Sequence, residues 1–231
     1  MYVVRLVKKR LLAKKQLKAV AKTSVSIKKS ASIKSLMAVG MLLALTGCAT
    51  YQPSNSHNLC SIFEGSNDWY QDAKASSQKW GTPIPVMMAI MQQESNFVDD
   101  ARPGYKYFLW VIPTGRLSSA YGYSQALNGV WGEYKQSTGN RFADRDDFDD
   151  AIDFIGWYTD GTQKQTGVSK WDAYGQYLAY HEGRGGYKRK TYNRKPWLLG
   201  VANKVKRNAA SYTTQLNGCK ASLDKNSNSW F

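Results

Sequence analysis

One carboxylate occupies a position from which acid catalysis is chemically feasible. Glu94 ends a segment in which Ile84, Met87 and Met91 recur at helical spacing, so all four residues share one face of a predicted helix. A carboxylate at the end of an apolar stripe either reaches solvent at the edge of the core or is desolvated. Desolvation disfavours the charged form and raises the pKa, which keeps a proton available for donation near neutral pH.

The same periodicity outlines the helices that must position Glu94. It predicts helices at 64–79, 122–137, 148–160, 170–182 and 197–215. Thr82-Pro83 predicts the capped start of the helix that carries Glu94. No segment of useful length alternates apolar and polar residues, and residues 99–120, rich in glycine, proline and aromatic residues, are expected to form a long loop. The sequence therefore predicts a single, mainly α domain.

The net charge of +15 is concentrated at one end of the chain. Residues 1–47 contain eleven basic residues and no acidic one, whereas residues 48–231 contain 21 basic and 17 acidic residues. A nucleic-acid-binding function is therefore not expected of the larger part. Within it, the basic stretch 184–207 and the acidic stretch 144–172 are either two solvated faces or, in the basic case, the wall of a groove that attracts a polymer bearing carboxylates.

The basic N-terminal stretch leads into an apolar run over residues 36–45 and then into Leu45-Thr46-Gly47-Cys48. The run is too short to span a bilayer as a mature helix but fits the core of a secretory signal. Its end resembles the bacterial lipobox, which implies cleavage before Cys48 and lipidation of the Cys48 sulfur. Ala49 follows, which implies the periplasmic face of the outer membrane. The alternative is a buried cysteine that closes a short core helix.

This interpretation also predicts the state of the three cysteines. Lipidation of Cys48 leaves Cys60 and Cys219, and an oxidising compartment predicts a disulfide between them. The alternative is two free thiols.

A set of motifs in a fixed order resembles a known family of enzymes. Glu94-Ser95-Asn96-Phe97 is similar to the Glu-Ser-x-Phe motif of lytic transglycosylases of the soluble-lytic-transglycosylase (SLT) type, relatives of goose-type lysozyme. Residues 120–126 resemble the family's Gly-Leu-Met-Gln segment, keeping Gly122 and Gln125. Residues 148–153 loosely resemble Asp-Pro-x-x-Asn-Ile, residues 178–183 resemble Ala-Tyr-Asn-x-Gly, and residues 201–212 look like the terminal helix whose tyrosine faces the cleft. The resemblance covers roughly residues 80–215.

The resemblance implies a mainly α, lysozyme-like domain that cleaves the β-1,4 bond between N-acetylmuramic acid and N-acetylglucosamine in peptidoglycan. Glu94 would be the single general acid and base, and the product would carry a 1,6-anhydro ring. The implied substrate-binding residues are Ser95, Gly122, Tyr123, Ser124, Gln125, Tyr180, His181 and Tyr212. Trp110 and Trp131 are further candidates for stacking on sugars, with core packing favoured for Trp131 and Trp157.

The expected organisation is a signal peptide over residues 1–47, a lipid-anchored linker over 48–60, the transglycosylase domain over 61–220 and a tail over 221–231. His57 lies in the linker and is expected to be solvated. The loop at 99–119 is either a wall or lid of the cleft or a packed surface loop.

Departures from the family pattern bear on the site. Ser124 replaces a methionine, and His181 and Asp153 each replace an asparagine. The carboxylate of Asp153, if it lay close to Glu94, would raise the pKa of Glu94 further. His181-Glu182 is too small a set for a zinc site, so no metal or cofactor is expected.

The expected partners are peptidoglycan glycan strands, the membrane through Cys48, and proteins of the cell-wall or envelope machinery, but no nucleic acid. The alternative functions are a muramidase that uses water and a non-catalytic lipoprotein that binds the cell wall.

Overall fold

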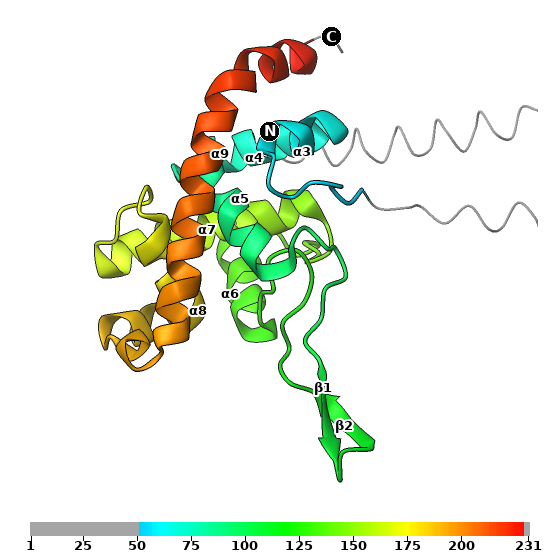
Figure 1. The fold of residues 1–231 in the computed structure, drawn as a ribbon, viewed down its shortest axis with the longest axis vertical. Helices are drawn as coiled ribbons and strands as arrows, with labels where there is room; N and C mark the ends of the chain where they lie inside the picture. The colour runs from blue at the N-terminus through cyan, green and yellow to red at the C-terminus, as the bar shows by residue number, and fades with distance from the viewer. Residues whose placement is uncertain (1–50, 229–231) are drawn as a thin grey trace, which may run out of the picture. The chain divides into compact units, whose positions relative to one another are not determined.

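The computed structural model describes residues 51–228, apart from the side chains of Asn67 and residues 226–228. The expected signal peptide over residues 1–47 and the lipidation of Cys48 lie outside the described residues. The described part is mainly α, as predicted (Figure 1). Its elements in chain order are α3 (Leu59–Gly65), α4 (Asn67–Trp80), α5 (Ile84–Ser95), β1 (Tyr105–Phe108), β2 (Ile112–Arg116), α6 (Asn128–Thr138), α7 (Phe148–Thr166), α8 (Ala173–Lys188), the 3₁₀ turn η2 (Thr191–Arg194) and α9 (Pro196–Asn228).

Helix α5 is the buried centre of the domain. Its residues 84–92 are buried on every side of the helix, not only along the predicted stripe. A helix that is apolar all round belongs inside a core, and α5 is packed between α9, α7, α8 and α4. Figure 1 shows the long α9 running past α5, α7 and α8. The backbone that carries Glu94 is therefore held from several sides.

The start of α5 is fixed differently from the prediction. Pro83 occupies the N-cap position without a side-chain cap, so Thr82 is not the capping residue. The Thr82 hydroxyl instead lies 2.7 Å from the Thr159 hydroxyl on α7, and both side chains are completely buried. A capping role would have needed Thr82 at the N-cap itself, whereas one residue earlier its side chain faces a neighbouring helix.

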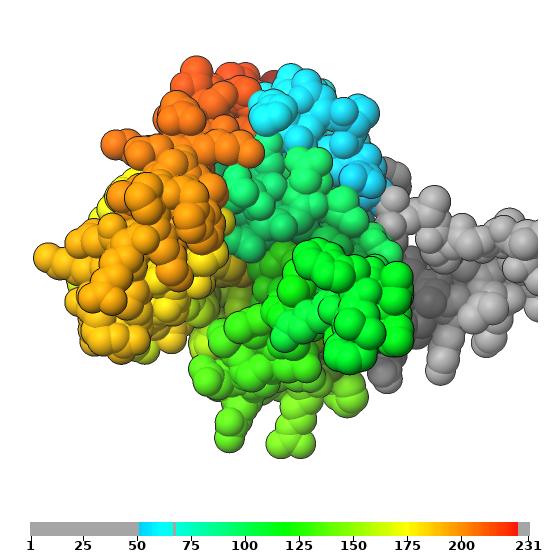
Figure 2. All heavy atoms as spheres, turned by 60° about the horizontal axis from the view of Figure 1, so that its bottom comes forward, coloured from blue at the N-terminus to red at the C-terminus, as the bar shows by residue number. Residues whose placement is uncertain are grey.

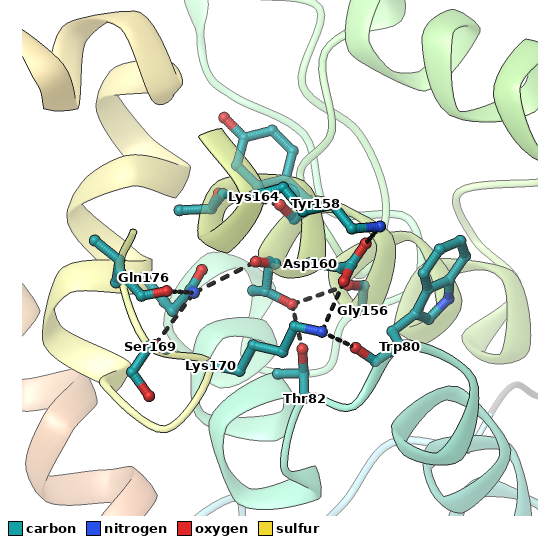
Figure 3. Close-up of polar contacts among 12 residues, drawn as sticks. Trp80, Thr82, Gly156, Tyr158, Asp160, Lys164, Ser169, Lys170 and Gln176 are labelled. Carbon is teal, nitrogen blue, oxygen red and sulfur yellow. Dashed lines mark hydrogen bonds and ion pairs between the residues drawn. The ribbon is translucent and has the colours of Figure 1, made fainter. Parts of the chain in front are cut away.

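A second set of polar contacts ties the same corner to α7 and α8 (Figure 3). The Lys170 ammonium donates to the Trp80 carbonyl oxygen at 2.5 Å and to the Asp160 carboxylate at 2.6 Å. Gln176, on α8, donates its amide to the carbonyl oxygens of Val168 and Ser169, both at 3.3 Å. These contacts join the end of α4, shortly before α5 begins, to α7 and to the segment that leads into α8.

The segment predicted as a loop contains the antiparallel β1–β2 hairpin, which projects from the domain in Figure 1. The expectation of no strand was wrong because every residue of both strands is exposed, so the strands show no alternation between a buried and a solvent face. The helix predicted from residue 122 starts at Asn128, because Tyr121 and Ala126 pair across a turn.

The two ends of the described domain are joined as predicted. Cys60 on α3 and Cys219 on α9 form a disulfide, 159 residues apart in sequence. Helix α9 continues to Asn228, so the residues assigned to a tail from 221 onward belong to it through 228. Asp224 accepts a hydrogen bond from the Tyr70 hydroxyl at 2.9 Å, which ties this last part of α9 to α4.

The linker predicted over residues 48–60 is also part of the fold where it is described. The Tyr51 ring packs edge-on against Trp69 at 5.1 Å and its hydroxyl donates to the Ile62 carbonyl oxygen at 3.2 Å. Leu59 already starts α3. Within residues 51–228, no helix combines the length and the apolar character that crossing a membrane requires.

Candidate active site

Glu94 lies in the last turn of α5 and lines a cavity of about 300 Å³. Its side chain is partly buried. The other lining residues are polar or charged: His57, Gln92, Gln93, Ser95, Asn96 and Lys204. The space-filling view shows α5 reaching the surface between the yellow-to-orange C-terminal part and the green segment around the hairpin (Figure 2).

The surroundings of Glu94 favour its protonated form. Burial raises the pKa of the Glu94 carboxyl from 4.5 to about 7, and a hydrogen bond with Tyr177 acts in the opposite direction. The position near the negative end of the α5 dipole also disfavours the carboxylate. Glu94 is therefore a carboxylic acid that exchanges its proton near neutral pH, which is the behaviour predicted for a desolvated group at this position.

Two tyrosines of α8 stand beside Glu94. Tyr177 makes the hydrogen bond to its carboxyl, and the charge of Glu94 contributes after burial to raising the pKa of both Tyr177 and Tyr180. The Tyr180 hydroxyl donates to the Ser124 carbonyl oxygen at 2.6 Å. The tyrosine that orients the Glu94 carboxyl is therefore Tyr177, which precedes Tyr180 by three residues on the same helix face.

The chain turns sharply immediately after the candidate acid. Asn96 and Phe97 both have positive φ, 51° and 63°, a conformation that residues other than glycine seldom adopt. The Phe97 ring is completely buried, at 6.0 Å from Trp69. Ser95 lines the cavity, and its hydroxyl donates to the Met91 carbonyl oxygen at 3.4 Å. Strain of this kind is stored where the surrounding structure holds it, and here it sits beside Glu94.

The Gly122–Gln125 segment is linked to α8, beside Glu94, by the hydrogen bond from the Tyr180 hydroxyl to the Ser124 carbonyl oxygen. A Cβ on Gly122, which has a φ of 74°, would lie 2.0 Å from the Arg145 carbonyl oxygen. The close approach that requires glycine at position 122 is therefore to the backbone of Arg145, and the substrate contact expected of Gly122 stays a prediction. The Gln125 amide nitrogen donates to the carbonyl oxygens of Ala101 and Gly122, at 2.8 and 3.0 Å, so it shapes this loop.

Three predicted substrate contacts lie elsewhere. The Tyr123 ring is buried against Trp69 and Phe148, in edge-on contacts at 5.5 and 5.8 Å, so it cannot stack on a sugar. His181 is exposed, bonds Glu182 at 3.0 Å and does not line the cavity of Glu94. The Tyr212 hydroxyl donates to the Ser56 carbonyl oxygen, beneath the N-terminal segment and not in the cavity.

That N-terminal segment contributes to the site, although no pattern in the sequence predicts it. His57 is exposed, as expected, but it lines the cavity of Glu94. Its ring lies 3.1 Å from the amide nitrogen of Gln92, which also donates to the Ser56 carbonyl oxygen at 2.7 Å. Asn208 on α9 donates to the Gln92 amide oxygen at 2.6 Å. No local pattern reveals these contacts, because they join residues up to 116 positions apart.

Asp153 does not act on Glu94. Its buried carboxylate is bonded to the Lys79 ammonium at 2.9 Å, the Trp80 indole at 2.7 Å and the Tyr134 hydroxyl at 2.8 Å. It does not contribute to the raised pKa of Glu94, contrary to the expectation. Among residues 51–228, no group of three metal-ligating side chains is close enough together to hold a metal ion.

Of the tryptophans considered for stacking on sugars, two pack in the protein interior and one is exposed. Trp131 is buried in an aromatic cluster with Tyr134 and Phe154, and Trp157 packs against the same two rings. Trp110 lies at the tip of the hairpin with 94% of its surface exposed.

The mainly α fold is that of a single lysozyme-like domain. More specifically, the chain matches the family described as transglycosylase SLT domain over residues 36–219, and it belongs to that family. Membership implies peptidoglycan glycan as the substrate. No curated protein sequence matches the chain.

Proposed function

We propose that the protein is a lytic transglycosylase that cleaves the β-1,4 bond between N-acetylmuramic acid and N-acetylglucosamine and leaves a 1,6-anhydro product. The observation that carries the proposal is the protonation state of one group. Glu94 has a pKa of about 7 and is the only carboxylate among the described residues that line its cavity. Hydrolytic glycosidases commonly pair two carboxylates, whereas a single one suffices when the substrate supplies its own nucleophile.

The reaction uses the Glu94 carboxyl twice. The protonated acid first donates its proton to the glycosidic oxygen, and the bond from this oxygen to C1 breaks to give an oxocarbenium-like centre. The Glu94 carboxylate then takes the proton from the C6 hydroxyl of the same sugar, whose oxygen forms the new bond to C1. No water is consumed and Glu94 ends protonated, ready for the next cycle.

The roles of the neighbouring residues follow from their contacts. Tyr177, through its hydrogen bond, holds the carboxyl and stabilises the carboxylate between the two steps. Ser95 lines the cavity and is placed to contact the substrate. His57, from the N-terminal segment, and Lys204, from α9, line the same cavity. The Tyr180 hydroxyl donates a hydrogen bond to the Ser124 carbonyl oxygen and so holds the loop that contains Ser124 against α8.

Product analysis of purified protein on peptidoglycan sacculi tests the proposal. Mass spectrometry should find muropeptides that are one water lighter than those released by a muramidase. Glu94→Gln should abolish their release while leaving binding to sacculi intact. Hydrated products would instead support the muramidase, and unchanged release by Glu94→Gln would refute the assignment of the acid. Binding to sacculi without any product from the wild type would support the non-catalytic alternative.

We also propose that the protein is a lipoprotein of the outer membrane, facing the periplasm, with its anchor on Cys48. The proposal rests on the order of the basic stretch, the apolar run and the lipobox-like residues 45–48. Cys48→Ala should shift the protein from the outer-membrane fraction to the soluble periplasmic fraction. Retention of that variant in the membrane would contradict an anchor at Cys48.

A further inference from the structure

The tip of the β1–β2 hairpin is an exposed apolar surface, which we call the hairpin tip and define as residues 108–112. Its side chains are Phe108, Leu109, Trp110, Val111 and Ile112, and they leave 59, 69, 94, 73 and 53% of their surface exposed. Single exposed apolar residues are common on soluble proteins, but a contiguous group of this kind marks a binding surface.

The backbone of the hairpin tip disfavours the residues that form it. The Val111 amide donates to the Phe108 carbonyl oxygen at 3.3 Å, and the two residues between them, Leu109 and Trp110, have positive φ of 50° and 64°. Positive φ at both central positions favours Asn-Gly. The large apolar side chains are therefore not there for the turn, and they point to a contact outside the chain.

The base of the hairpin carries positive charge. Arg102, Arg116 and Arg145 line a cavity of about 300 Å³ whose described lining contains no carboxylate. The Arg102 and Arg145 guanidinium groups lie 4.1 and 5.2 Å from the centre of the Tyr121 ring. Asp146 accepts a hydrogen bond from the Tyr121 hydroxyl at 2.8 Å and offsets part of the charge. Three guanidinium groups around one cavity are suited to phosphate oxygens.

The distance between base and tip fits a lipid surface. Tyr105 pairs with Arg116 at the base, and Phe108 pairs with Ile112 near the tip. Strands advance about 3.3 Å per residue, so the tip reaches about 10 Å beyond Arg116. Interfacial protein segments bury their apolar side chains roughly 5–10 Å into the boundary between headgroups and acyl chains. Tyr105 lies level with the base and Tyr107, paired with Pro113, lies between base and tip, where aromatic side chains are enriched in membrane-bound proteins.

We propose that the hairpin tip inserts into an anionic phospholipid surface, with lipid phosphates held at the cavity of Arg102, Arg116 and Arg145. This contact is separate from the anchor proposed at Cys48 and does not depend on glycan cleavage. A glycan strand is a poorer partner, because the aliphatic side chains in the tip offer nothing to sugar hydroxyls. A second copy pairing along the strand edge is disfavoured by Pro113, which lacks an amide hydrogen, and by the irregular register between Lys106 and Tyr107.

Fluorescence quenching by brominated lipids tests the proposal on the full-length chain. The protein is bound to vesicles of phosphatidylglycerol and phosphatidylcholine, with or without bromine on the acyl chains. The N-terminal segment does not contribute to the signal, because the first tryptophan in the chain is Trp69. Emission should be lower in the brominated vesicles. Trp110→Phe should remove this difference, whereas the matched control Trp171→Phe, which changes another exposed tryptophan outside the hairpin, should keep it.

Two further variants separate membrane contact from folding. Leu109→Asn combined with Trp110→Gly gives the turn its preferred residues, so the hairpin should remain folded while the quenching is lost. Arg102→Gln combined with Arg116→Gln should weaken quenching in anionic vesicles and leave it unchanged in vesicles of phosphatidylcholine alone. Equal quenching in the wild type and in Trp110→Phe would overturn the proposal. If Trp110 were shielded from solvent only when glycan is added, a glycan strand would replace the lipid as the partner. If it were shielded only at concentrations where the protein sediments as a dimer, a second copy of the chain would be the partner.

Discussion

Replacing Glu94 by glutamine should stabilise the protein at neutral pH while it removes activity. Glutamine has almost the same shape but carries no charge at any pH. The folded protein retains the Glu94 proton up to about pH 7, whereas the unfolded chain releases it near its ordinary pKa of 4.5. Folding therefore takes up a proton between these two values, and the free energy of unfolding falls as the pH rises through this window.

The size of the effect follows from the shift. A displacement from 4.5 to about 7 corresponds to about 3 kcal/mol in the free energy of unfolding. This is an upper limit because the side chain is only partly buried and solvent screens part of the cost. Glu94→Gln should therefore be more stable than the wild type by up to about 3 kcal/mol at pH 8 and equally stable at pH 4.

Urea unfolding at pH 4, 6 and 8, followed by circular dichroism, measures this difference as a change in midpoint at constant slope. Glu182→Gln is the control with the opposite sign. Burial acts to raise the pKa of Glu182, but hydrogen bonds from Lys195, Thr191 and His181 outweigh it and lower the pKa to about 2. Its charge therefore stabilises the fold above pH 4.5, and this contribution is lost as the pH falls towards 2. If Glu94→Gln had the wild-type midpoint at all three pH values, the reasoning about a desolvated acid would be refuted.

Three other predictions follow from single contacts. Tyr177→Phe removes the hydrogen bond that lowers the pKa of Glu94, so the alkaline limb of the kcat/KM profile should move up by about one pH unit or more; an unmoved limb would contradict the role of Tyr177. Cys60→Ser combined with Cys219→Ser should lower the free energy of unfolding by roughly 4 kcal/mol, measured by thermal or urea unfolding; a loss below about 1 kcal/mol would show that the bridge does not constrain the unfolded chain. Gly122→Ala should destabilise the protein more than Gly139→Ala, because both glycines have φ above 70° but only the first has backbone at the Cβ position; equal losses would argue against the close approach to Arg145.

The helical class and the main helices could be predicted because their apolar residues pack against the core at regular spacing. The hairpin could not, since β1 and β2 bury neither face and so carry no alternating pattern. The start of α6 was placed six residues too early because apolar and aromatic residues near position 123 serve a turn and an aromatic cluster, not a helix. Periodicity predicts elements only where one face is buried.

In the site, the residues that could be predicted were those defined by chemistry within one segment. Glu94 was selected by the resemblance of residues 94–97 to the Glu-Ser-x-Phe motif, and the cysteines by their number and compartment. The contributions of Tyr177, His57 and Gln92 depend on contacts between distant segments, and no local rule indicates which tyrosine of α8 reaches the acid. Gly122 and Tyr123 were expected to contact the substrate because of their place in a motif, whereas packing explains both residues.

A pKa close to 7 suits a group that acts both as acid and as base, which is the role proposed for Glu94. A carboxyl with the ordinary pKa of 4.5 would be almost fully ionised at neutral pH and would lack the proton for the first step, whereas one with a pKa far above 7 would be protonated again before it could act as a base. Burial at the end of α5 supplies the first requirement, and the hydroxyl of Tyr177 limits the shift. The same hydrogen bond strengthens when the carboxylate forms, so it stabilises the state between the two proton transfers. The balance between a buried helix end and one tyrosine is therefore sufficient, in physical terms, for a single side chain to serve as acid and base.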